Sequence, residues 1–224
     1  MARTWADADA DQERKTAHEF VRERLRRAIL RGDLTGGERL IQADLAEMLH
    51  VSTTPVREAL RDLATEGLIT LDRHRGGVVR ELNWDEMDEI GQIRRQLEPL
   101  AMGLVIERID EAGIREAERL LHRMSKERDV GDWVELNRAF HFVFHEATGN
   151  ARLMAIMKGL EESVALYVAQ AQRTHPQMRR LADAGHAALV EAVRARDIDR
   201  AVQVMVEHVG MPIEMTEHDE RQDR

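Results

Sequence analysis

The sequence predicts a mainly α protein in two parts: a helical N-terminal part with a small β-hairpin, followed by an all-α helical bundle. Three observations support this prediction. The chain has 224 residues, of which 43% are apolar, so two small domains can each bury a core. Only four prolines occur, which leaves room for long helices. At Asn83 the predicted elements change from helices with short strands to helices alone.

Changes in composition and periodicity set the expected boundaries. Residues 1–15 are polar and acidic without periodicity, so we expect a flexible arm. The first domain is expected at 16–81 and the second at 82–216. The polar end of the chain, residues 217–224, is expected to be disordered.

Within the first domain, an apolar stripe predicts a helix over 16–31, and three glycines between 32 and 37 end it. A short helix is expected over 42–49 and a longer one over 54–66, with the turn VSTT between them. Gly67 is expected to be the C-terminal cap of the longer helix. The segments 68–71 and 78–80 read as two short strands around the turn 72–77.

From Asn83 onward the pattern is helical throughout. Asn83 followed by Glu86 is the Asn variant of a capping box. Glycine, asparagine, aspartate and proline residues interrupt the periodicity at five places. The helices are therefore expected at about 84–107, 111–128, 132–148, 151–174, 176–196 and 198–216.

Charge and cysteine content restrict the function. Residues 14–80 carry 13 Lys/Arg against 10 Asp/Glu, whereas residues 81–224 carry 19 against 28. The net charge of −9 therefore belongs to the second half, and a local basic surface for nucleic acid remains available in the first. The absence of cysteine excludes disulfides and thiolate metal sites. Neither a signal peptide nor a membrane span is recognisable, so we expect a cytoplasmic protein without a membrane partner.

The stretch from 43 to 79 has the pattern of a winged helix-turn-helix. Val56, Leu60 and Leu63 form the buried face of the longer helix, while Arg57 and Arg61 share its solvent side. The free N–H groups at the start of that helix favour a phosphate, which implicates Ser52, Thr53 and Thr54. The hairpin tip is basic and suits a minor groove or a backbone, which implicates Arg73, His74, Arg75 and Gly76. The alternative for each arginine is an ion pair on a solvated face, as Arg57 with Glu58 or Asp62.

The same stretch resembles the winged-helix domain of the GntR family of transcription regulators. The resemblance rests on Pro55–Leu60 followed by Leu63 and Glu66–Leu68. It implies DNA contacts from the start of the second helix, from Arg57 and from the tip of the wing. Many relatives carry arginine at the position of Thr53, so the operator sequence is expected to differ from the commonest one.

The second half places histidines on apolar helix faces. Asn137 and His141 are four residues apart, and His186 and His208 interrupt the stripes of two later helices. Three imidazoles and one amide oxygen form a candidate site for a divalent metal such as Zn, Ni or Mn. A histidine in such a position is more often a hydrogen-bonded core residue, and His145 is a competing ligand candidate.

These helices resemble the FCD effector domain of the FadR-type branch of the family. The resemblance rests on Arg94-x-x-Leu97-Glu98, Asn137-x-x-Phe140-His141, Gly185–His186 and Glu207–His208. It implies a metal that helps to hold a small carboxylate effector. Metal-binding members have aspartate and three histidines at these places, and the aspartate position is Asn137 here; a carboxylate is a stronger oxygen ligand than an amide.

Arg94 is the predicted effector-binding residue, because guanidinium binds carboxylate in a bidentate manner; a structural ion pair with Glu98 is the alternative. Ligand binding is expected to shift the arrangement of two winged helices in a homodimer on a palindromic operator, with repression as the expected output. Three other hypotheses remain open: a second half that only dimerises, a sensor of acyl chains lined by methionines such as Met102, Met154 and Met157, and a metal-dependent helical enzyme.

Overall fold

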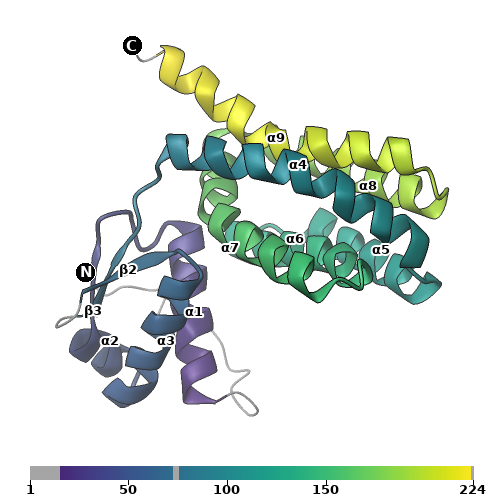
Figure 1. Cartoon of the computed structure of the whole chain (residues 1–224). Coiled ribbons are helices and arrows are strands. Elements are labelled where there is room, and N and C mark those ends of the chain that lie inside the picture. Colours follow the sequence, from purple (N-terminus) through teal and green to yellow (C-terminus); the bar gives the residue numbers. More distant parts are fainter. Residues whose placement is uncertain (1–15, 73–75, 223–224) are drawn as a thin grey trace. The chain divides into compact units, whose positions relative to one another are not determined.

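The computed structural model describes residues 16–72 and 76–222, and the chain divides into two compact units that meet between Leu82 and Asn83 (Figure 1). The expected arm and the predicted contacts Arg73, His74 and Arg75 lie outside the described residues. The described residues of the first unit form three helices and three strands, and those of the second unit form only helices.

In the first unit, helix α1 (Ala17–Arg31) packs against α3 (Thr53–Thr65), and α2 (Gln42–Met48) precedes the turn to α3. A complete capping box starts α1: the Thr16 hydroxyl accepts from the Glu19 N–H, and the Glu19 carboxylate accepts from Thr16. Most residues of the predicted apolar stripes are buried, namely Leu25, Ala28, Ile29, Val56, Leu60 and Leu63, whereas the stripe residue Phe20 is only partly buried.

The sheet of this unit has three antiparallel strands rather than the two expected. Its order is β1 (Arg39–Ile41), β3 (Gly76–Val79) and β2 (Ile69–Asp72). Strand β1 has three residues, which is too short for an alternation signal, and it exists because β3 offers a second edge. Gly76 permits this pairing: its φ is +119°, and a Cβ there would lie 1.9 Å from the Leu40 carbonyl oxygen.

From Asn83 to Gln222 the second unit forms six helices close to the expected positions. They are α4 (Trp84–Arg108), α5 (Glu111–Lys126), α6 (Val130–Ala147), α7 (Ala151–Thr174), α8 (Met178–Arg194) and α9 (Ile198–Gln222). Helix α4 packs against α9, and α5, α6 and α7 follow one another side by side (Figure 1). The core is built around the aromatic side chains of α6, and Trp133, Phe140 and Phe144 are fully buried.

Two details of this unit differ from expectation. Asn83 caps α4 as predicted, because its side-chain oxygen accepts from the Glu86 N–H. In a capping box the Glu86 side chain would accept from the Asn83 N–H. Here that N–H donates instead to the hydroxyl of Tyr167, 84 positions away, at 3.2 Å. Helix α9 extends to Gln222, six residues beyond the expected end at 216. Glutamate, arginine and glutamine in that segment favour helix, which explains the continuation.

Candidate functional site

Three histidines from three helices meet in the interior of the second unit. His141 comes from α6, His186 from α8 and His208 from α9, and one ring nitrogen of each lies within 4.8 Å of the others. His141 and His186 are 2% and 0% exposed, so water does not solvate these imidazoles. The Nε2 atoms of His141 and His208 are 3.2 Å apart. The sequence therefore singled out three side chains that the fold brings together.

Packing around the cluster holds the rings in place. Phe140 lies 4.7 Å from the His186 ring, and Trp133 lies 6.0 Å from it, measured between ring centroids. Gly185 lets α9 approach α8, because a Cβ at this position would lie 3.0 Å from Nδ1 of His208. The predicted oxygen ligand Asn137 is buried one turn before His141 on α6.

The environment keeps these imidazoles neutral. Burial lowers the pKa of His141 and of His186 well below 6.5, and the neighbouring His208 lowers both further. Burial also lowers the pKa of His208 to about 4, with a further decrease from Arg94 and an opposing increase from Glu98. Neutral imidazoles have lone pairs available for a cation at physiological pH.

The buried nitrogens of the cluster lack partners of their own. Among the described residues, Nδ1 of His141, Nδ1 of His208 and both ring nitrogens of His186 have no hydrogen-bond partner. Unsatisfied buried polar atoms are costly, so such a cluster needs a reason to persist. A divalent cation would accept one lone pair from each imidazole, and the donor set fits a borderline metal such as Zn or Ni.

Arg94 lies in an ion-pair network beside the histidines. Its guanidinium donates to Glu98 Oε1 at 2.9 Å and lies 3.0 Å from Glu161 Oε2. All three side chains are at most 7% exposed. Burial alone would raise the pKa of Glu98, but Arg94 and His145 outweigh it and lower that pKa. Arg94, the residue predicted to bind the effector, is thus already ion-paired with two carboxylates. The alternative prediction of a structural ion pair named one of them, Glu98.

His145 belongs to this network and not to the histidine cluster. Its Nε2 lies 3.9 Å from Glu98 Oε2, and the residue is 1% exposed. Glu161 was missed at the sequence level, although it occupies a recognisable position: it interrupts the apolar stripe of Met157 and Val164 on α7. An isolated acid on such a stripe is the signal that could have identified it.

The predicted DNA contacts occupy one end and one side of α3. Ser52 is the N-cap of this helix, and Ser52, Thr53, Thr54, Arg57 and Arg61 are all exposed. Gly76, also a predicted DNA contact, is buried in β3. Its positive φ of 119° requires a glycine at this position. The described side chains therefore present a hydroxyl-rich helix N-terminus beside two exposed guanidinium groups.

Comparison with known proteins agrees with this architecture. The family model "Bacterial regulatory proteins, gntR family" matches residues 17–79, and the model "FCD domain" matches residues 89–211. The "Probable D-xylose utilization operon transcriptional repressor" of Paenarthrobacter nicotinovorans is 30% identical over 92% of this chain and 91% of its own. "HTH-type transcriptional repressor GlaR" of Escherichia coli (strain K12) is 28% identical over 84% of this chain and 90% of its own.

The fold also matches a solved structure. "E. coli McbR/YncC" superimposes with a TM-score of 0.75 at 24% identity, covering 92% of this chain and 99% of that one.

Within the described residues, every helix is too short or too polar to cross a lipid bilayer. Relatives and family models alike describe transcription regulators, not enzymes. The chain belongs to the GntR family of DNA-binding transcription regulators, with a winged helix-turn-helix followed by an FCD domain.

Proposed function

We propose that the protein is a repressor whose helical unit binds a small organic acid with the help of a divalent metal. The observation that carries this proposal is the convergence of His141, His186 and His208, whose ligand atoms lie within 4.8 Å of one another and include nitrogens without partners. Two similar proteins are named repressors, which supports the output. We propose that the protein is located in the bacterial cytoplasm, because the DNA that it binds is there.

In this proposal the three imidazoles hold the metal and Asn137 supplies a fourth, oxygen ligand. All four ligands are neutral, so they leave the charge of a divalent cation uncompensated. The neighbouring Arg94, Glu98 and Glu161 together contribute one net negative charge. The remaining positive charge attracts an anionic effector, for which the metal supplies open coordination positions. An effector carboxylate that approached Arg94 would have to displace Glu98 or Glu161.

The DNA-reading side of the proposal assigns α3 to a major groove. Ser52, Thr53 and Thr54 lie at its N-terminus, where exposed residues contact phosphates and base edges. Arg57 and Arg61 extend from its exposed side. We propose that the hairpin between β2 and β3 reaches the adjacent minor groove, with Arg73, His74 and Arg75 at its tip.

A homodimer is proposed because α4 exposes an apolar seam. Ile93 and Leu100 are 48% and 55% exposed. Leu97 lies between them and Leu104 follows Leu100, so the four residues are spaced three or four apart on one face of α4. On α7, which packs against α4, Ile156 is also 52% exposed. A second copy of the same seam is a complementary partner, and a twofold dimer explains a palindromic operator.

The experiment that tests the effector site is metal analysis of the purified protein with a thermal-shift panel of small organic acids, with and without chelator. We expect near-stoichiometric metal, and stabilisation by at least one acid that chelator abolishes. His186→Ala should lower the metal content, whereas His122→Ala, which removes an exposed imidazole on α5, should not. Absence of metal in protein prepared with added Zn or Ni would refute the metal site.

The same panel separates the alternatives. If neither acids nor metal change the unfolding temperature, the second unit only dimerises, and Leu100→Glu should still shift the protein to monomer in light scattering. An acyl-chain sensor would be stabilised by fatty acids without metal. Met102 and Met157 are 0% and 1% exposed in the packed core, which agrees better with an ordinary core.

A further inference from the structure

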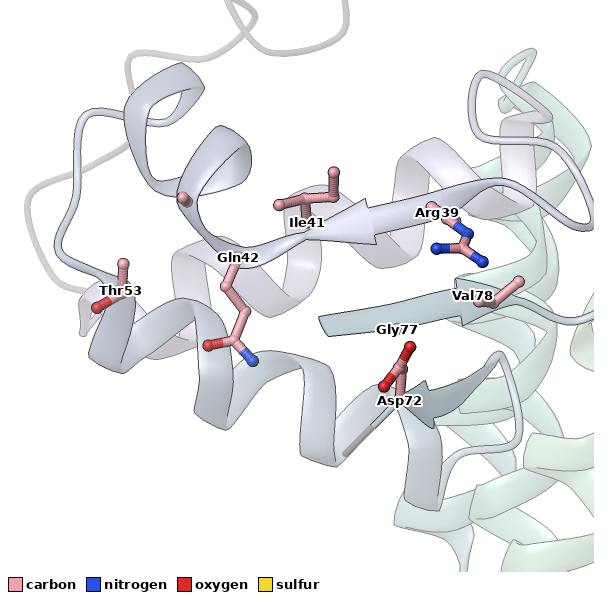
Figure 2. A pocket seen from close by; sticks show the side chains of 8 residues that line it. Arg39, Ile41, Gln42, Thr53, Asp72, Gly77 and Val78 are labelled. Atoms are coloured by element: carbon pink, nitrogen blue, oxygen red, sulfur yellow. The ribbon is translucent and has the colours of Figure 1, made fainter. Parts of the chain in front are cut away.

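The first unit has a hollow of about 460 Å³ between the start of α3 and the solvent side of the sheet. Figure 2 shows Arg39 extending from β1 toward β3, and Gln42 extending from the start of α2 toward α3. Thr53 at the first turn of α3 and Asp72 at the end of β2 lie at the margins of the hollow (Figure 2). Of the predicted DNA contacts that the structure describes, only Thr53 lines it.

Strand register shows why this face is open. Arg39 pairs with Val78, and Ile41 with Gly76, so Arg39 and Ile41 point to the same side of β1. Leu40, between them, points the other way and is buried in the core. The hollow is therefore on the solvent side of the sheet, and Ile41 is left 45% exposed there.

We propose that this hollow seats the DNA strand that separates the major groove from the adjacent minor groove, with Arg39 bonded to one of its phosphates. The proposal rests on the placement of α3 and of the β2–β3 hairpin given above. If α3 occupies one groove and the hairpin occupies the next, the sugar–phosphate backbone between the grooves crosses the surface between them. That surface is the hollow.

The charges and chemistry of the lining fit a nucleic-acid backbone. Of the arginines described in the first unit, only Arg39, Arg57 and Arg61 are exposed, and no ion pair involves any of these three in the described structure. A guanidinium without a carboxylate partner is well suited to a bidentate phosphate contact. Arg39 therefore extends the positive surface of α3 onto β1.

The other lining residues define how the strand lies. The Gln42 amide donates to a phosphate or sugar oxygen, and the exposed Ile41 side chain offers apolar contact to a deoxyribose. Asp72 is a carboxylate at the hairpin side of the hollow, and it repels phosphates there. This distribution places the bound phosphate at the Arg39 side of the hollow, away from Asp72.

The test is the salt dependence of binding to a random-sequence duplex, because a phosphate contact is independent of sequence. Arg39→Ala should lower the slope of log K against log salt by about 0.9 per bound protomer and weaken binding about eightfold at about 0.1 M salt. Gln42→Ala should weaken binding without changing the slope. Arg39→Lys keeps the positive charge and should therefore keep the wild-type slope. Arg115→Ala, which removes an exposed arginine from the helical unit, is the control for net charge.

Arg57→Ala separates failure of this inference from failure of the proposed DNA-reading face. If Arg57→Ala weakens binding while Arg39→Ala behaves like Arg115→Ala, the hollow does not hold DNA and the placement of α3 stands. If neither Arg39→Ala nor Arg57→Ala has an effect, the proposed face itself is wrong. Unchanged circular dichroism of each variant confirms that the exposed substitutions leave the fold intact.

Discussion

His208 should make the metal-free protein lose stability in mild acid. A histidine in the unfolded chain titrates near 6.5, whereas burial beside Arg94 lowers the pKa of His208 to about 4 in the folded protein. The stability from keeping the folded imidazole neutral is therefore fully present above pH 6.5. It is lost as the pH falls toward the folded pKa, because the unfolded chain takes up the proton first.

The size of the effect follows from these two values. Between about pH 7.5 and about pH 5, the lowered pKa of His208 should cost ~2 kcal/mol of unfolding free energy. His208→Asn removes the titrating group, so the variant should lose ~2 kcal/mol less than the wild type over the same interval. The lowered pKa values of His141 and His186 act in the same direction in both proteins.

The assay is urea unfolding followed by tryptophan fluorescence, at both pH values, in chelator and at one protein concentration. Trp133 reports on this region because it is fully buried beside the His186 ring. His122→Asn, an exposed substitution on α5, is the matched control. Equal losses of stability in wild type and His208→Asn would show that His208 is not held neutral by the fold.

Three further substitutions test the first unit by urea unfolding. Thr16→Ala removes the capping box of α1 and should cost ~1 kcal/mol, whereas retention of full stability would show that the cap contributes nothing. Glu66→Ala removes the carboxylate that Arg22 and the buried Arg26 share, and should cost ~3 kcal/mol; a loss below that of Thr16→Ala would contradict this. Gly76→Ala should cost at least ~2 kcal/mol, because its Cβ would meet the Leu40 carbonyl; wild-type stability would exclude the close approach.

Local signals in the sequence were sufficient for most helices. Those of the second unit have strong periodicity and polar N-caps, and Asp110 and Asn150 cap α5 and α7 in the structure. Such signals depend on residues within one or two turns, so they can be read without knowing the fold. Strand β1 carries no comparable signal, because three residues become a strand only when β3 lies beside them.

The sequence by itself also determined which side chains have metal-binding chemistry. His141, His186 and His208 interrupt apolar helix faces, and that pattern alone identifies them as candidate ligands. Only the tertiary structure decided that these three meet while His145 lies with Glu98 instead. Helical spacing states which face a residue occupies, but not which helix packs against that face.

The same limit explains Arg94. Its chemistry predicted a partner carboxylate, and its spacing predicted Glu98, which is four residues away. Glu161 is 67 positions away, and only the packing of α7 against α4 brings it within 3.0 Å of the guanidinium. Local chemistry thus specified what each residue can bind, and long-range packing, driven by burial of apolar surface, decided which partner it has.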